Sequence, residues 1–475
     1  MGVTSKASFS EISKSHYLFS TFNYFRLRKL IDEKPYFLKV RLGDFFEIIS
    51  GFAFSSKDYT DEGVLVCRIG DISKANELLV GEMLRLPEEY FEQYEKYRVQ
   101  KDDILIGLTG DGKYFKTCLV ELDEPEILLN QRVGILRLKK GVSDIAIKFI
   151  AHLFNIDEVQ NQIRIVAMGK TQKNVSPFDI LNVKIPDVDY TKQNELLEKI
   201  KPLELEISNL KNSKLQPVNV INQAFGEALD FDWSAFETIK KEKAYTSNIS
   251  KFANNIDCRM GIRFHNKAGA YIQAFLESKT NKKIKDYISE NIVLGKSVSP
   301  SDYDDDGEYF YIAMSNIKAW AFDPEDCKKV SESYAASNLN KTVKKGDILL
   351  ARSGEGTIGK VALIEDEDIN GIFADFTQRI RLKGFDPLCA YYYMRSDFFQ
   401  YLVYTHKKGL GNNTNIFPSQ IREFPMPDWN ETQQAEIVET IKTQLDAQKE
   451  IDRQIEEKQQ VINKIIEAAI KQEQN

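Results

Sequence analysis

The sequence contains few of the residues from which metal centres, disulfides and membrane spans are built. Its five cysteines form no C-x-x-C pair and predict the reduced thiols of a cytosolic protein. None of the four histidines has a carboxylate or a second histidine at metal-ligand spacing. No apolar run reaches the roughly 18 residues of a membrane span, and the first 20 residues lack the apolar core of a secretory signal. We therefore expect a cytoplasmic protein with no metal ion and no membrane contact.

Sequence motifs for catalysis are also scarce. Gly354–Gly359 spells G-x-G-x-x-G, but an extended run follows it instead of a helix, and Glu355 would lie where a pyrophosphate needs amide protons. Gly169-Lys-Thr171 lacks the first glycine of a phosphate loop, because that position is Arg164. No methyltransferase motif and no nucleophile–base arrangement is visible. We expect a non-catalytic protein without a cofactor.

What the sequence does contain is an internal repeat. The segment Val99–Gly110 recurs 244 residues later as Val343–Gly354, and Val175–Ile180 recurs 241 residues later as Ile416–Ile421. Nearly equal offsets over separate blocks indicate a tandem duplication of about half the chain. A chain of 475 residues is also too long for a single core. Two similar folded units are therefore predicted.

The repeat suggests an α+β architecture in which two similar domains are joined by long helices forming an antiparallel coiled coil. Each half has short apolar strands separated by Gly, Asp and Lys turns, with short helices among them. The predicted boundaries are an N-terminal lead-in segment (1–39), domain 1 (40–188), a central helical spacer (189–235), a linker with a lead-in helix (236–283), domain 2 (284–428) and a C-terminal helical spacer (429–475).

Two helices carry apolar residues at heptad spacing. The predicted seam, a protein-interaction surface that would hold the spacer together, consists of Leu196, Ile200, Leu203, Ile207 and Leu210 on the first helix and Ile437, Ile441, Leu445, Ile451 and Ile455 on the second. Each stripe either packs on its own domain or pairs with the other stripe, and pairing would make the helices a spacer of fixed length. Pro202 lies inside the first seam and predicts a kink or a new helix start.

Polar, glycine-containing loops occupy equivalent places in the two halves, at 168–174 and 407–415. Lysine and arginine neutralise phosphates, and asparagine and glutamine amides bond base edges. The negative net charge of −7 does not exclude DNA, because local patches bind phosphate. The predicted DNA-binding residues are Lys113, Lys116, Arg132, Lys170, Thr171, Gln172, Lys173, Asn174, Arg352, Lys360, Arg379, Lys407, Lys408, Asn412, Asn413, Thr414 and Asn415, with Arg132 and Arg379 as counterparts.

Several segments resemble the specificity subunits of type I restriction-modification systems. They are Leu42–Phe46, Ser50–Tyr59, Cys67–Ile72, Lys344–Arg352, the prolines Pro186 and Pro427, and the helices that begin near Gln193 and Gln434. The resemblance implies a subunit without catalysis whose two domains each read one half of a split, asymmetric target in double-stranded DNA. It also implies two adenine-methylating modification subunits and motor-nuclease restriction subunits as partners, with S-adenosylmethionine and ATP bound by those partners. Because Leu108 stands where the second half has Arg352, the two halves are expected to read different bases.

Three other functions remain open from the sequence. One is a specificity partner of another methylation or phage-defence system, and another is a protein-interaction scaffold that binds no DNA, which the net charge of −7 favours. A nuclease ranks last, because no ligand or nucleophile cluster is visible.

Overall fold

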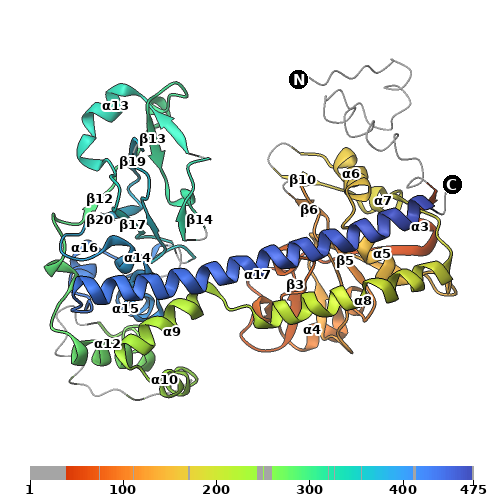
Figure 1. Cartoon of the computed structure of the whole chain (residues 1–475), viewed down its shortest axis with the longest axis horizontal. Coiled ribbons are helices and arrows are strands. Elements are labelled where there is room, and N and C mark those ends of the chain that lie inside the picture. The colour runs from red at the N-terminus through yellow and green to blue at the C-terminus, as the bar shows by residue number, and fades with distance from the viewer. Residues whose placement is uncertain are drawn as a thin grey trace. The chain divides into compact units, whose positions relative to one another are not determined.

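The computed structural model describes residues 39–73, 75–110, 112–169, 172–242, 246, 250, 259–318, 320–325, 327–354, 356–367, 369–409 and 413–472 (Figure 1). The predicted lead-in segment 1–39 therefore lies outside the described residues apart from Lys39. The chain divides into two compact units: unit 1 comprises Met1–Asn212 and Arg453–Asn475, and unit 2 comprises Ser213–Asp452.

Unit 1 is built on two small sheets. The larger has the antiparallel order β2-β9-β5-β7, with strands Phe46–Ser50, Val133–Leu138, Ile104–Gly107 and Thr117–Leu119. The smaller has the order β4-β3-β8, with strands Leu84–Leu86, Val64–Cys67 and Ile127–Leu129. Strands β3 and β8 run parallel. All four residues of β5 are buried, which explains why its sequence is continuously apolar instead of alternating.

Unit 2 repeats this topology. Its larger sheet has the order β12-β20-β17-β18, with strands Val293–Leu294, Thr377–Ile380, Ile348–Ala351 and Val361–Leu363. Its smaller sheet has the order β16-β13-β19, with strands Lys328–Val330, Tyr309–Ile312 and Gly371–Phe373, of which β13 and β19 are parallel. The same strand order and the same single parallel pair in both units confirm the predicted duplication and the α+β class.

Short helices cover the larger sheet in each unit. In unit 1 they are α5 (Ile147–Leu153), α6 (Asp157–Val166) and α7 (Pro177–Leu181). Their counterparts in unit 2 are α14 (Pro387–Arg395), α15 (Asp397–His406) and α16 (Pro418–Ile421). Unit 2 also contains α9 (Pro217–Leu229), α10 (Trp233–Lys240) and α12 (Lys267–Lys279).

Glutamine side chains join each long helix to the domain that precedes it. At the start of α8 (Tyr190–Ser213), the amide of Gln193 accepts from Ala146 N at 2.8 Å and donates to Val188 O at 2.8 Å. Gln434, near the start of α17 (Glu431–Gln472), makes the equivalent bonds to Asp386 N and Trp429 O at 2.6 and 2.7 Å. Both glutamines are buried, so these amides satisfy backbone groups that water does not reach.

The apolar stripe of α8 packs against the last part of α17, within unit 1. Leu196, Ile200 and Ile207 share a core cluster with Ile462 and Ile466. The two helices run in opposite directions (Figure 1), and Lys458 of α17 pairs with Glu206 of α8. This arrangement confirms the predicted antiparallel pairing. Pro202 does not start a new helix, because α8 continues through this residue, and the kink stays a prediction.

The first part of α17 has different neighbours from those predicted. Ile437 and Ile441 lie in the core of unit 2, together with Ile221 and Phe225 of α9. Unit 1 therefore combines domain 1, α8 and the last part of α17. Unit 2 combines domain 2, the first part of α17 and α9. The prediction of one seam along both helices was wrong in this respect, because only the second part of α17 packs on α8.

Several seam residues are not available to partner subunits. The side chains of Leu196, Ile200, Ile207, Ile437 and Ile441 are each at most 9% exposed. Leu203, Leu210, Leu445, Ile451 and Ile455 are partly exposed. The buried members stabilise the chain itself, and the partly exposed members stay predicted partner contacts.

Candidate nucleic-acid interface

Three extended segments meet side by side at the end of the central strand in each unit. In unit 2, Arg352 N donates to Phe376 O and Ile416 N donates to Arg352 O, both at 2.9 Å. In unit 1, Leu108 N donates to Arg132 O and Val175 N donates to Leu108 O, again at 2.9 Å. Because these bonds are equivalent, they define which residues of the two repeats correspond.

The predicted polar loops form one side of each ladder. In unit 1, Met168 and Asn174 exchange two backbone hydrogen bonds, and Asn174 pairs with Thr109 on β6 (Thr109–Gly110). In unit 2, Lys408 and Asn415 exchange the same two bonds, and Asn415 pairs with Ser353. The sequence therefore identified two segments that the fold brings to the same position in both units.

A glycine with positive φ closes each of these hairpins. Gly169 has φ 130°, and a Cβ there would lie 2.0 Å from Gln172 O. Gly409 has φ 96°, and a Cβ there would lie 2.3 Å from Asn413 O. An L side chain would be strained in this backbone conformation and would also collide with the hairpin.

Arg352 is held in a fixed orientation at the centre of the unit 2 ladder. Its Nε donates to Asp375 O at 2.7 Å, and its Nη1 donates to Asn415 Oδ1 at 3.3 Å. The side chain remains partly exposed. A guanidinium that is oriented by the protein and still reaches solvent can bond the O6 and N7 atoms of guanine, or a phosphate.

The predicted residues fall into three groups by exposure, of which the buried group is Arg379, Lys407 and Thr414. The exposed group is Lys113, Arg132, Gln172, Asn174 and Asn413, and the partly exposed group is Lys116, Lys173, Arg352, Lys360, Lys408 and Asn415. Lys170, Thr171 and Asn412 lie outside the described residues.

Four predicted DNA contacts are wrong, because three of these side chains are buried and the fourth bonds the protein backbone. Arg379 is 5% exposed, pairs with Glu290 at 2.5 Å and also donates to Thr342 O. Burial, followed by the charge of neighbouring Arg381, lowers the pKa of Arg379. Lys407 is 4% and Thr414 0% exposed, so neither reaches a surface ligand. Lys116 donates its ammonium protons to the carbonyls of Ile69 and Ile72, so it holds the turn at 69–72 in place.

The proposed correspondence of Arg132 with Arg379 is also wrong. The ladder bonds match Arg132 with Phe376, whereas the strand register places Arg379 opposite Leu349, where unit 1 has Ile135 opposite Leu105. Arg379 points from the strand into the unit and is buried, so its charge is not offered to DNA. Adjacent polar residues in the sequence did not distinguish an outward arginine from an inward one.

Sequence reasoning missed the exposed apolar side chains beside the ladders. Phe178 and Met168 in unit 1 are 67% and 49% exposed, and Phe376 and Phe417 in unit 2 are 49% and 38% exposed. Unit 1 has Leu108 and Arg132 where unit 2 has Arg352 and Phe376. The guanidinium and its apolar neighbour are thus exchanged between adjacent segments, so the two surfaces differ in chemistry although their backbones match.

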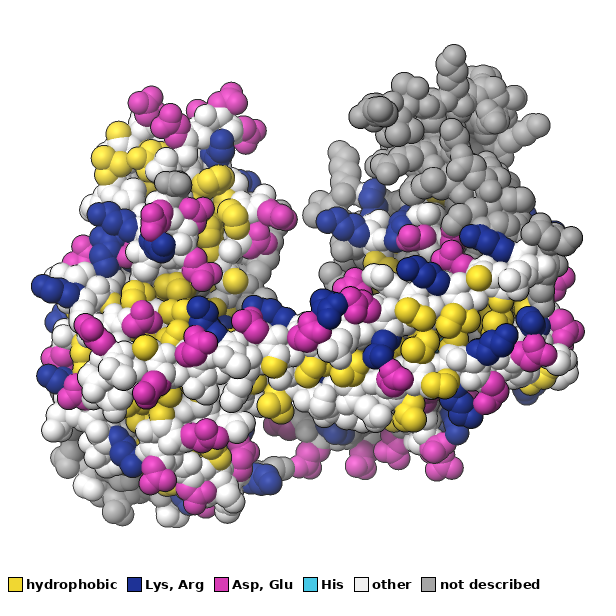
Figure 2. Space-filling model, in the orientation of Figure 1, with side chains coloured by type: hydrophobic (Ala, Val, Ile, Leu, Met, Phe, Trp, Pro, Cys, Tyr) yellow, Lys and Arg dark blue, Asp and Glu magenta, His cyan; other side chains and the backbone are white. Residues whose placement is uncertain are grey.

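No group of three or more possible metal ligands occurs among the described residues. Within that same part of the chain, no helix is both long enough and apolar enough to cross a membrane. Figure 2 shows lysine and arginine side chains interspersed with acidic ones over the face in view, together with hydrophobic side chains along α8 and α17 of unit 1.

Two curated proteins resemble this chain. A type I restriction enzyme MjaVIII specificity subunit from Methanocaldococcus jannaschii is 26% identical over 180 residues, which cover 37% of this chain and 41% of that protein. The chain thus spans less than half of that relative. A type I restriction enzyme EcoBI specificity subunit from Escherichia coli is 23% identical over 423 residues, or 88% of this chain and 81% of that protein.

Solved structures and a family model were also compared with the chain. A type I restriction-modification S subunit from M. genitalium aligns over 90% of this chain and 95% of its own length, with 13% identity and a TM-score of 0.33. An HsdS subunit from Thermoanaerobacter tengcongensis aligns over 91% and 95%, with 13% identity and a TM-score of 0.29. The family model of the type I restriction modification DNA specificity domain matches twice, at residues 37–219 and 277–463. Since these two matches cover most of the sequence, the chain belongs to the family of type I restriction modification DNA specificity domains and carries two copies of that domain.

Proposed function

We propose that this chain is the DNA-specificity subunit of a type I restriction-modification complex and reads a split, asymmetric target. Each unit reads one half-site in double-stranded DNA. The chain directs adenine methylation by two modification subunits, and restriction by motor-nuclease subunits, and has no catalytic activity of its own.

The observation that carries this proposal is the pair of matching ladders with different side chains. A duplicated backbone offers the same surface twice, and substitution at matched positions, such as Arg132 against Phe376, makes each surface selective for different bases. Direct readout requires such differences, because each base pair presents its own pattern of donors and acceptors in the major groove. An asymmetric target follows from two unlike halves.

The ladder residues divide into two roles. Lys173, Lys113, Lys360 and Lys408 are proposed phosphate contacts, since lysine neutralises phosphate without reading sequence. Arg352, Asn415, Arg132, Gln172, Asn174 and Asn413 are proposed base readers. Lys170, Thr171 and Asn412 remain proposed contacts in the same loops.

Methylation mapping tests the function directly. Adenine methylation in genomic DNA is compared by single-molecule sequencing between the source cell and a cell that lacks this chain. Loss of methylation at one split motif is expected. An unchanged map in cells that express the chain together with its modification subunits would contradict the proposal.

A second comparison tests the assignment of the ladders. Substituting Arg352 with alanine is expected to relax one half of the motif while the other half is kept. Substituting Arg132 is expected to affect the opposite half. If both variants changed the same half, the assignment of one unit to each half-site would be wrong.

A further inference from the structure

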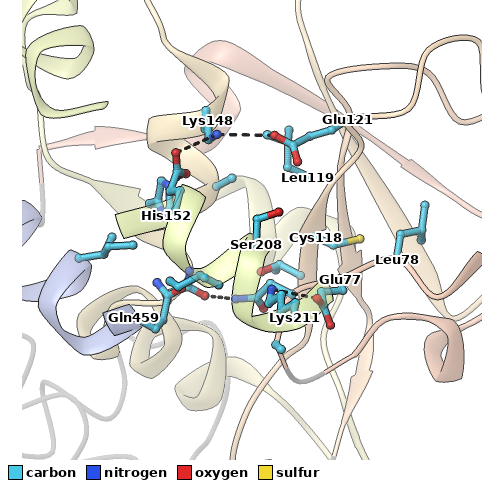
Figure 3. Close-up of a pocket in the computed structure, with 18 of the residues that line it drawn as sticks. Glu77, Leu78, Cys118, Leu119, Glu121, Lys148, His152, Ser208, Lys211 and Gln459 are labelled. Carbon is cyan, nitrogen blue, oxygen red and sulfur yellow. Dashed lines mark hydrogen bonds and ion pairs between the residues drawn. The ribbon is translucent and has the colours of Figure 1, made fainter. Parts of the chain in front are cut away.

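Unit 1 contains a groove that the proposed DNA-reading surface does not use. It has a volume of about 650 Å³, within the size range of ligand pockets. Strand β7, helix α5, helix α8 and the last part of α17 line it (Figure 3). Cys118 and Leu119 come from the sheet, and Lys211 of α8 pairs with Glu77 across it at 2.9 Å.

The charged groups of this groove already neutralise one another. Lys148 lies between Glu121 and Glu204, at 3.6 and 3.0 Å, and His152 Nε2 is 3.0 Å from Glu204 (Figure 3). Although burial acts in the opposite direction, the bonds from His152 and Lys148 lower the pKa of Glu204. Because these charges are paired, the groove does not attract a free ion of either sign.

What remains unsatisfied is apolar surface. Leu205 of α8 is 63% exposed and Leu122 is 40% exposed, and both line the groove. Leu78 and Leu119 line it as well. A hollow with apolar walls and a neutralised polar rim fits a large apolar side chain better than it fits an ion.

Unit 2 has a pocket at the corresponding place, and there the space is largely filled. Its volume is about 200 Å³. Five residues that line it are the repeat counterparts of residues that line the unit 1 groove. Ala321 and Phe322 correspond to Glu77 and Leu78, Leu363 and Glu365 correspond to Leu119 and Glu121, and Tyr391 corresponds to Ala151. The two repeats therefore have a pocket at the same place, and the pocket of unit 2 is the smaller one.

In unit 2, two aromatic residues stand where unit 1 has the smaller groove residues Ala151 and Asn76. Tyr391 replaces Ala151, and its hydroxyl donates to Trp320 O at 2.5 Å. Trp320 occupies the turn position that Asn76 holds in unit 1, with φ values of 67° and 61° respectively. The guanidinium of Arg395 lies 5.9 Å from the Trp320 ring, whereas in unit 1 the side chain of Asn76 bonds that of Asn155 and accepts from the hydroxyl of Tyr114 at 2.9 Å.

We propose that the unit 1 groove receives an aromatic side chain from a methylating partner subunit, at the place where unit 2 has Tyr391 and Trp320 of its own chain. This inference rests on the proposed function, since it places that partner. The groove opens along α8, where Leu205 is exposed beside it. One partner subunit is therefore anchored at unit 1 by a contact that unit 2 does not offer, and the two partner sites are unequal.

The test fills the groove as the second repeat does. The variant Ala151→Tyr introduces the residue that unit 2 has at this position, and Lys199→Gln changes an exposed residue of α8 that does not line the groove. The purified modification subunit encoded with this chain is titrated into each full-length protein in a calorimeter. Two binding affinities are expected for wild type and Lys199→Gln, whereas Ala151→Tyr is expected to weaken the tighter one at least tenfold.

A second variant keeps the test decisive if Ala151→Tyr folds poorly. Leu205→Glu places a charge on an exposed apolar position, so it spares the core and is expected to weaken the same binding step. Unchanged affinity in folded Ala151→Tyr and in Leu205→Glu would overturn the groove proposal, and the proposed function would stand. A wild-type chain that bound neither its target DNA nor a modification subunit would overturn both.

Discussion

A buried ion pair recurs in both units, and its removal should cost the two units different amounts of stability. In unit 1, Asp103 is 1% exposed and accepts from Arg137 Nε and Nη2 at 2.9 and 2.7 Å. In unit 2, Asp347 is 1% exposed and accepts from Arg381 Nε and Nη2, both at 2.7 Å. These aspartates belong to the most similar stretch of the two repeats.

The arginines differ in what else they contact. Arg137 has one further acceptor, the carbonyl of Arg98 at 2.9 Å. Arg381 has a second carboxylate, Glu290, at 3.2 Å. When the aspartate is removed, the charge of Arg381 is still partly compensated and the charge of Arg137 is not.

Substituting Asp103 with alanine is therefore expected to destabilise unit 1 by roughly 3–5 kcal/mol, the usual cost of breaking a buried pair from one side. Asp347→Ala should cost less by about 1.5–3 kcal/mol, the contribution of one hydrogen bond to a charged group. For a unit of this size, the loss in Asp103→Ala corresponds to a fall in Tm of roughly 6–20 °C.

Thermal unfolding of the full chain, with hydrogen–deuterium exchange read by mass spectrometry, measures this difference. Exchange should increase chiefly in peptides of the unit that carries the substitution. The double variant Asp103→Leu with Arg137→Met should recover much of the loss, because it leaves no buried charge without a partner. Equal losses in the two single variants, or a loss under about 1 kcal/mol in Asp103→Ala, would refute the reasoning.

Three further predictions concern the ladders, a close packing contact and pH. Arg352→Ala should cost about 1–3 kcal/mol of discrimination at one base pair, whereas Lys173→Ala should weaken binding to every sequence and reduce the slope of log affinity against log salt by about 0.9, both measured by fluorescence anisotropy. Gly51→Ala should destabilise unit 1 by about 1–3 kcal/mol in a denaturant titration, because its Cβ would lie 2.2 Å from the carbonyl oxygen of Asn130. The hydrogen bonds from two lysines lower the pKa of Glu423 from 4.5 to about 2, so its stabilisation is present above about pH 4.5 and lost as the pH falls towards 2. Since Glu423 is about half exposed, the effect should stay below about 1 kcal/mol and disappear in Glu423→Gln.

Patterns within short segments were sufficient to predict much of this protein. The repeated blocks predicted two α+β units, and the heptad spacing predicted that α8 would pair with an antiparallel helix. The repeat is visible from the similarity of blocks 241–244 residues apart, and the heptad spacing from residues close together, whose periodicity reflects the face that they bury. The two polar loops were also located correctly, because equivalent positions in a duplicated fold lie in equivalent places.

Only the tertiary structure decided which side chains of these segments are exposed and able to contact DNA. Arg379 and Lys407 carry charges typical of DNA contacts, yet the strand register and the packing of neighbouring elements bury both. The exchange of Arg132 and Phe376 between the ladders follows from hydrogen bonds between segments that lie far apart in sequence.

The division of α17 between two cores likewise depends on contacts over long sequence separations, as does the bond between Tyr391 and Trp320 in unit 2. The sequence by itself determined the duplicated architecture, because periodicity and repetition are visible in the order of the residues without knowledge of how they pack. Register, burial and the filling of space arise only when distant segments pack together, so the tertiary structure alone decided which residues form each surface.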